Sequence, residues 1–179
     1  MRVGSLLAFV PLMLASGCGG ADGPASVQGA IAGRSFASAF ASSGHAYREA
    51  VIDISDASGY CHALASGADE TGSQILALDL QEGDLVAGTT TFPSHTGDYT
   101  IFDANTPNPS GQLASGSYVY LGTSFETSTV TDASSGTVTL TDIDGSHYAG
   151  SFDITFATGD ALRGTFDAAA CSAIKTPEQ

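Results

Sequence analysis

Two aspartates near the C-terminus are the first residues whose type and spacing suggest chemistry. Asp153 and Asp167 each end a near-copy of one phrase, Gly-Ser-Phe-Asp and Gly-Thr-Phe-Asp. Paired carboxylates serve as general acid and base in many enzymes, and carboxylates are also common metal ligands. What these two can do depends on the hairpin in which they lie.

The register of that hairpin follows from its apolar side chains. Phe152 and Phe166 must share the buried face, so the loop between the strands needs an odd number of residues. A three-residue loop over 158–160 sets Phe152 opposite Phe166. It also places Asp153 and Asp167 on the other face as diagonal neighbours, with Cβ atoms about 7 Å apart. The residues predicted beside them are small or polar and build no cleft. We therefore interpret the aspartates as an exposed pair, with a working acid–base pair as the alternative.

Two glycines begin the repeated phrases. Gly150 and Gly164 fall on the inward face of the predicted hairpin. An inward glycine leaves room for a neighbouring aromatic ring, or it allows the strand to coil. The repeated phrase therefore indicates sheet geometry.

A second set of acids invites a calcium interpretation. Asp142, Asp144 and Asp153 stand at the first, third and twelfth positions of a stretch that resembles an EF-hand loop. The sixth position holds His147 where that loop needs glycine, and no helices are predicted on either side. Asp144-Gly145 between two alternating runs is a strong hairpin signal. We favour a structural turn, and a calcium site is the alternative.

Other catalytic and cofactor motifs are absent from the sequence. It has no Gly-x-Ser-x-Gly, no His-Glu-x-x-His, no P-loop and no dinucleotide fingerprint. His45, His62, His95 and His147 all lie in or beside predicted turns, and we interpret them as solvent-facing. A Ser–His–Asp site assembled in space stays open, because such triads are recognised by geometry. The expectation is a protein without a cofactor that is not an enzyme.

Composition and charge narrow the class of protein. The 179 residues carry 5 Lys and Arg against 19 Asp and Glu, for a formal net charge of -14. That charge repels phosphate backbones, so a nucleic-acid partner is not expected. The 22 Gly, with Thr, Phe, Tyr, Val and Ile in short runs, are typical of an all-β domain.

The N-terminus resembles that of a bacterial lipoprotein. Arg2 is followed by an apolar run, Leu6–Leu14, and then by small residues before Cys18. The run is too short to span a bilayer. This order is similar to a lipobox, although Ala15 stands where that motif prefers Leu. The resemblance implies removal of residues 1–17 and acyl chains on Cys18 that bind a membrane.

The same resemblance bears on localisation and domain boundaries. Gly19 follows the cysteine where Asp would retain a lipoprotein in the inner membrane, so the outer membrane is expected. We predict the lipidated Cys and a flexible tether over 18–27, an all-β domain over 28–174 and a C-terminal tail over 175–179. The two cysteines beyond Cys18, Cys61 and Cys171, are expected to form a disulfide.

Period-two alternation predicts a single antiparallel β-sandwich or barrel of roughly 8–11 short strands, mostly in hairpin order. One helical turn is expected at Tyr60–Ala65. The predicted strands are Gly29–Phe36, Ser38–Ser42, Glu49–Ser55, Gln74–Leu80, Val86–Phe92, Asp98–Asp103, Ser117–Gly122, Ser124–Val130, Gly136–Asp142, Tyr148–Ala157 and Leu162–Ala169.

Three stretches, "ISDASGYC", "SGTVTL" and "GTFDAAAC", together with the lipobox, resemble uncharacterised β-rich lipoproteins of myxobacteria and related bacteria. That resemblance implies no activity. The sequence thus predicts a lipid-anchored envelope protein whose β domain is a binding or structural module. A lipocalin-like carrier of a small apolar ligand and a hydrolase with a spatially assembled site are the alternatives.

Overall fold

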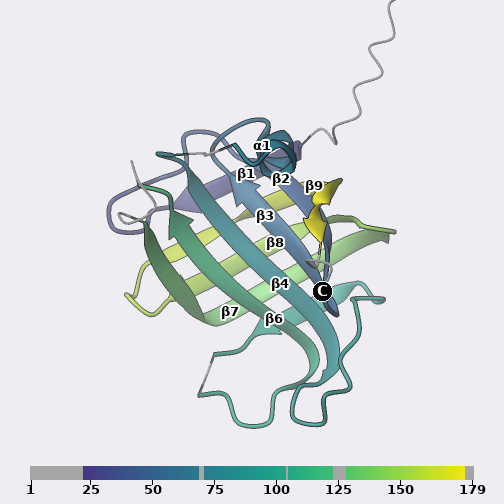
Figure 1. Cartoon of the computed structure of the whole chain (residues 1–179). Coiled ribbons are helices and arrows are strands. Elements are labelled where there is room, and N and C mark those ends of the chain that lie inside the picture. The colour runs from purple at the N-terminus through teal and green to yellow at the C-terminus, as the bar shows by residue number, and fades with distance from the viewer. Residues whose placement is uncertain (1–21, 69–70, 104, 123–127, 176–179) are drawn as a thin grey trace, which may run out of the picture.

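The computed structural model describes residues 22–68, 71–103, 105–122 and 128–175 (Figure 1). Within these ranges one sheet and one short helix make up the regular structure. The elements are β1 Gly23–Gly29, β2 Phe40–Ala46, β3 Glu49–Ser55, α1 Tyr60–Ser66, β4 Gln74–Asp84, β5 Gly97–Ile101, β6 Ser110–Tyr120, β7 Thr129–Asp144, β8 His147–Phe156 and β9 Ala161–Lys175.

The nine strands form one mixed sheet that closes into a ring in the order β1-β2-β3-β4-β6-β5-β7-β8-β9. The ring closes because β9 pairs with β1 through its first half and with β2 through its second half. The prediction of a mostly-β chain is thus confirmed, and the strands belong to one sheet. Figure 1 shows α1 near one end of the ring and long loops at the other.

The expectation of a purely antiparallel sheet is wrong at two places. β1 and β2 are antiparallel to each other, so the long β9, antiparallel to β1, must run parallel to β2. In the same way β5 inserts between the antiparallel pair β6 and β7, which makes it parallel to β6. Both parallel pairs arise because one strand lies beside two strands of opposite direction.

The inside of the ring is filled by side chains. Alternate residues of the strands point inward, and many of them are inaccessible to water from any side. An internal cavity of ligand size would leave its lining accessible, so this part of the core is packed. The largest fully buried side chains are Tyr99, Tyr118, Tyr148, Phe156, Ile31, Ile52, Ile54, Leu76, Leu78, Leu80, Leu140 and Ile154.

The hairpin of β8 and β9 differs from its predicted register. Phe152 and Phe166 do share the buried face, and the loop has an odd number of residues. However, Thr155 pairs with Ala161 and Phe152 with Gly164, so β9 is shifted by two residues against the register that a loop over 158–160 gives. The predicted pairing of the two phenylalanines is therefore wrong. A turn in which the Phe156 N–H donates to the carbonyl of Asp160 at 2.9 Å sets this register.

Glycines face the two rings. Phe152 lies opposite Gly164, and Phe166 lies opposite Gly150. A Cβ added at Gly164 would stand 2.9 Å from Cζ of Phe152, and one added at Gly150 would stand 3.1 Å from Cζ of Phe166. The prediction that these glycines leave room for aromatic rings is confirmed.

Three predicted boundaries need correction. The structured part begins before Gln28, since β1 covers residues that we expected in the flexible tether over 18–27. No strand forms over Gly29–Phe36, because Ala32 and Gly33 adopt positive φ in a tight turn between Ile31 and Arg34. Val86–Phe92 is also not a strand, since the chain turns back at Gly88, where φ is 65°.

Outside the ring, α1 is fixed by a disulfide and by a remote cap. Cys61 of α1 is bonded to Cys171 of β9, as predicted, with Ile174 packed beside them. The bond closes a loop of 110 residues, which contributes roughly 4–5 kcal/mol in the chain-entropy account. The Asp22 carboxylate accepts the N–H groups of Gly59 and Tyr60 at 2.6 and 3.0 Å. No helix in the described ranges has the length and apolar character needed to cross a membrane.

Candidate functional site

The structure separates Asp153 and Asp167, the two aspartates whose spacing suggested a carboxylate pair. Asp153 lies opposite Arg163, and Asp167 lies opposite Ala149, so they are not the diagonal neighbours that a loop over 158–160 predicted. Both side chains are exposed, as expected. Asp167 instead contacts His147, with 2.5 Å between Oδ1 and Nε2. The register thus separates Asp153 from Asp167 along this face.

The calcium candidates are also divided between two places. Asp144 pairs with His147 across the β7–β8 turn, which is the hairpin that Asp144-Gly145 predicted. Asp142 lies close to this turn, whereas Asp153 lies opposite Thr137, well along the strands. Across the residues that the structure describes, no group of three or more His, Cys, Asp or Glu side chains is placed to hold a metal ion. The lipidation candidate Cys18 lies outside the described residues.

Three of the four histidines make specific contacts. His95 is nevertheless exposed, as we expected, whereas His45 and His147 are partly buried, so the interpretation as solvent-facing side chains does not hold for those two. His147 contacts Asp167, and His95 contacts Glu82 with 3.0 Å between Nδ1 and Oε2. His45 is half-buried and lies 2.7 Å from the Tyr148 hydroxyl through Nε2. His62, on α1, is exposed as expected.

Ser94, His95 and Glu82 come together as a serine, a histidine and an acid, the set that a spatially assembled hydrolase needs. In a working triad the two imidazole nitrogens face different partners, one the nucleophile and the other the acid. Here Ser94 Oγ and Glu82 Oε2 both lie 3.0 Å from the same nitrogen, Nδ1 of His95. Ser94 Oγ also donates directly to Glu82 at 2.9 Å. This geometry relays no proton from serine through histidine to the acid.

The Glu82 cluster (Glu82, Ser94, His95 and Tyr99) instead holds in place the segment that leads into β5. Glu82 Oε1 accepts hydrogen bonds from the Tyr99 hydroxyl at 2.6 Å and from the backbone N–H groups of Ser94 and His95 at 3.0 and 2.9 Å. Burial works to raise the pKa of Glu82, but the hydrogen bonds from Tyr99, His95 and Ser94 outweigh it and lower the pKa to about 2. The carboxylate therefore stays charged and holds the segment that leads into β5.

That segment, 85–96, is held at two further points. Its first turn closes on Asp84, whose side chain accepts the Ala87 N–H at 2.9 Å. Arg48, in the two-residue turn between β2 and β3, donates from Nη1 to the Gly88 carbonyl at 2.9 Å. We call this end of the ring, made by segment 85–96 and the Tyr47-Arg48 turn, the loop end. It is the end farther from α1 in Figure 1.

The loop end carries exposed apolar side chains and a pocket. Tyr47, Val86 and Phe92 are exposed by 68%, 69% and 37%. The pocket, of about 470 Å³, is lined by Arg48, Gly88, Thr89, Thr90, Thr91 and Phe92. Exposed apolar side chains beside a pocket are features that binding surfaces share.

Phe92 is supported from inside the ring. Its ring stacks on His45, with centroids 4.2 Å apart and planes 25° apart. His45 in turn reaches the buried Tyr148. Burial lowers the pKa of His45 and raises that of Tyr148, which favours the neutral forms of both groups at neutral pH. The stack gives Phe92 a fixed position.

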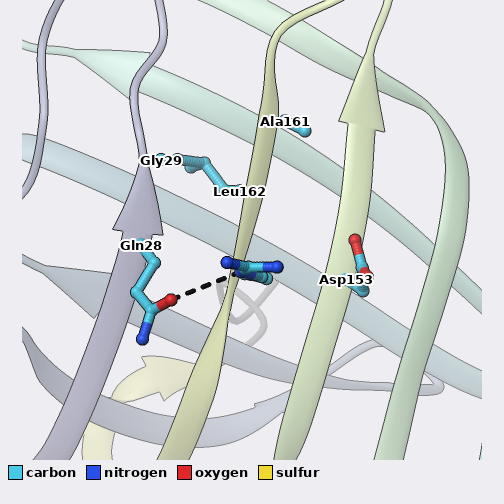
Figure 2. A pocket seen from close by; sticks show the side chains of 6 residues that line it. Gln28, Gly29, Asp153, Ala161 and Leu162 are labelled. Atoms are coloured by element: carbon cyan, nitrogen blue, oxygen red, sulfur yellow. Dashed lines mark hydrogen bonds between the residues drawn. The ribbon is translucent and has the colours of Figure 1, made fainter.

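A second hollow, of about 270 Å³, lies on the outer face of β1, β9 and β8 (Figure 2). Arg163 donates from Nε to Gln28 Oε1 at 3.3 Å, and Asp153 stands on the neighbouring strand. Figure 2 shows Gln28, Leu162 and Asp153 on adjacent strands of the sheet, with no loop folded over them. This hollow lacks the exposed aromatic side chain of the loop end.

The sequence prediction missed Arg48 and Phe92. Both lie in segments whose structure the local sequence pattern predicted wrongly or incompletely. Phe92, for example, was placed at the end of a predicted strand. Pro93, which follows it, was a signal that pairing stops there. The contact between Phe92 and His45 joins residues 47 positions apart, and no local pattern reports such a contact.

The fold and the site define a class of protein: a closed, disulfide-bonded β domain with a packed interior and a pocket at its loop end. Comparison with protein-family models, curated proteins and solved structures finds no match to this chain. Its function therefore has to be argued from its own residues.

Proposed function

We propose that the chain is a lipid-anchored protein of the bacterial cell envelope, on the outer membrane, whose β domain binds a partner through its loop end. The N-terminal resemblance to a lipobox supports the anchor on Cys18. The Cys61–Cys171 disulfide is in keeping with an oxidising compartment outside the cytoplasm. Because the sheet closes through β9, we class the domain as a barrel in preference to a sandwich.

One observation carries the binding role. Phe92 and Val86 are exposed on a segment that the Glu82 cluster, Asp84 and Arg48 hold in place. Exposed apolar groups are costly in water, and a rigid segment loses little conformational freedom when it binds. This combination favours recognition over a purely structural role.

The two alternative functions receive less support. A lipocalin-like carrier needs an internal cavity, but the side chains that point into the ring are packed against one another. A hydrolase needs a histidine between its nucleophile and its acid, but Ser94 and Glu82 share one nitrogen of His95. We therefore propose a protein that is not an enzyme and that needs no cofactor.

The anchor is tested with the variant Cys18→Ala. The full chain is expressed in its bacterium, and cell fractions are compared after detergent partitioning. The native protein should follow the detergent phase, and Cys18→Ala should be released to the aqueous phase. Unchanged partitioning of the variant would contradict the anchor.

The binding surface is tested by co-sedimentation of the full chain with cell-envelope fragments, that is, outer-membrane fragments and peptidoglycan sacculi. Phe92→Ala should reduce the bound fraction. Val130→Ala is the matched control, because Val130 is 61% exposed at the start of β7, away from the loop end. Equal loss in both variants, or no loss in Phe92→Ala, would count against the loop end.

A further inference from the structure

The chemistry of the loop-end pocket narrows what it can bind. Its lining combines one aromatic ring, three threonines and one guanidinium group. The volume of about 470 Å³ lies in the range of small-ligand sites, ~300–1,000 Å³. Such a lining offers an apolar plane together with hydrogen-bonding groups at its rim.

The ring of Phe92 supplies the apolar plane. One face is covered by His45, at a centroid distance of 4.2 Å, and the ring lines the pocket while it remains 37% exposed. A pyranose ring presents C–H groups on one face and hydroxyl groups around its edge. The C–H face packs well on an aromatic plane, and the hydroxyl groups then need donors and acceptors beside that plane.

The rim of the pocket is fixed in position. Thr91 pairs with Glu82 through two backbone hydrogen bonds of 2.8 and 2.9 Å, and the Thr89 N–H donates to the carbonyl of Asp84 at 3.1 Å. Arg48 uses one donor on Gly88, and a guanidinium group carries five N–H donors in total. The rim thus presents hydrogen-bonding groups whose backbone is already ordered.

The charge of the protein further limits the kind of ligand that the pocket can bind. The formal net charge of -14 disfavours a polyanionic ligand. Arg48, the one charged residue of the lining, is directly followed by the acidic Glu49, the first residue of β3. Neutral sugars carry no charge for this field to repel.

We propose that the loop-end pocket binds a neutral glycan through one or two pyranose units. Phe92 is the stacking platform, and Arg48 and the three threonines bind the hydroxyl groups. This inference rests on the proposed binding function and names the class of ligand for the same site.

The test is a titration of the full chain, in detergent, with three neutral disaccharides: cellobiose, maltose and N,N′-diacetylchitobiose. Binding is followed by NMR through the ring signals of His45, which all variants keep, and also those of Phe92 in the native chain. At least one sugar should bind with a dissociation constant in the millimolar range. Phe92→Ala should weaken that binding by about five- to tenfold, and Val130→Ala should leave it unchanged. Circular dichroism of each variant checks that the fold is retained.

Three outcomes overturn the inference. The first is that none of the three sugars shifts the ring signals at about 10 mM, well into the weak-binding range. The second is that Phe92→Ala binds the sugar as tightly as the native chain. The third is that polygalacturonate, an acidic glycan, binds more tightly than the neutral sugars. If envelope fragments still bind through Phe92 while the sugars do not, the proposed function stands and only the glycan is wrong. If neither binds, both proposals fail.

Discussion

Phe152 lies directly across from Gly164, with its ring over the glycine backbone, and no side chain is possible at that glycine without movement of the sheet. An added Cβ would overlap the carbonyl oxygen of Ser26 on β1 and would stand 2.9 Å from Cζ of Phe152. The three strands β1, β9 and β8 therefore approach one another more closely than a larger residue allows. This close approach occurs where the ring closes.

The first prediction is that Gly164→Ala destabilises the fold. Overpacking of this kind costs about 1–3 kcal/mol, and more where the backbone itself must move. Urea denaturation of the full chain should show a lower midpoint. Gly116→Ala is the control, because a Cβ there has its nearest contacts at 3.4 Å, to side-chain atoms. Similar midpoints for the two variants would mean that the ring tolerates a wider spacing at Gly164.

The second prediction concerns the remote cap on α1. Asp22 binds three backbone N–H groups at the start of the helix, those of Gly59, Tyr60 and Cys61. Asp22→Ala leaves these donors without that partner and should cost about 1–2 kcal/mol, as loss of a helix cap does. The thermal midpoint measures this effect.

The comparison for the cap is Asp22→Asn, which keeps one of the two acceptor oxygens. It can still accept the N–H groups of Gly59 and Tyr60 but not that of Cys61, so it should retain only part of the stability that Asp22→Ala loses. If both variants unfold at the temperature of the native chain, Asp22 does not hold α1 in solution.

The sequence predicted which side chains point into the ring, but it did not predict how the ring closes. Period-two alternation at Ile52, Ile54, Leu76 and Leu78 identified side chains that are fully buried. The parallel pairs were out of reach, because they depend on β9 being long enough to lie beside both β1 and β2. Strand length depends on which partners are present in the folded sheet, and local pattern does not contain that information.

The site was harder to predict than the fold for a related reason. Glu82 meets His95 and Ser94 only because the chain turns back at Gly88. We expected a strand there, since Val86 to Phe92 alternates and is rich in threonine. A glycine at positive φ breaks the strand, and the resulting turn brings Phe92 to His45.

The third prediction is a loss of stability as pH rises from acid toward neutral. Asp53 lies on the outer face of β3 and is buried. Burial, together with repulsion from Asp79, raises its pKa to about 7, and a hydrogen bond from Tyr60 offsets part of the rise. The folded chain thus holds this proton more tightly than the unfolded chain. The contribution of Asp53 to the free energy of unfolding should therefore be greatest below 3.8, the pKa of this group in the unfolded chain. It should fall as pH rises to about 7.

The measurement is the free energy of unfolding from urea titrations between about pH 4 and pH 8, with a decrease of about 2–4 kcal/mol over that range. Asp53→Asn has no carboxyl proton to lose, so its free energy of unfolding should vary less with pH. At pH 8 this variant should be more stable than the native chain. A native chain whose stability is constant from pH 4 to pH 8 would show that Asp53 is hydrated or paired in solution.

The fourth prediction is an opposite effect at acid pH, from the Glu82 cluster. The pKa of Glu82 is lowered to about 2 from 4.5, so the folded chain binds this proton less tightly than the unfolded chain. Its contribution is fully present above pH 4.5 and is lost as pH falls toward 2.

Glu82→Gln should remove this loss of stability at acid pH and should speed amide hydrogen exchange at Ser94 and His95, whose N–H groups lose a charged acceptor. Gln112→Ala is the matched control, because Gln112 contacts the His95 carbonyl at 3.4 Å and Tyr99 but accepts neither the Ser94 nor the His95 N–H. Equal exchange rates in the native chain and Glu82→Gln would show that the carboxylate does not hold segment 85–96, and the rigid binding surface at the loop end would lose its main support.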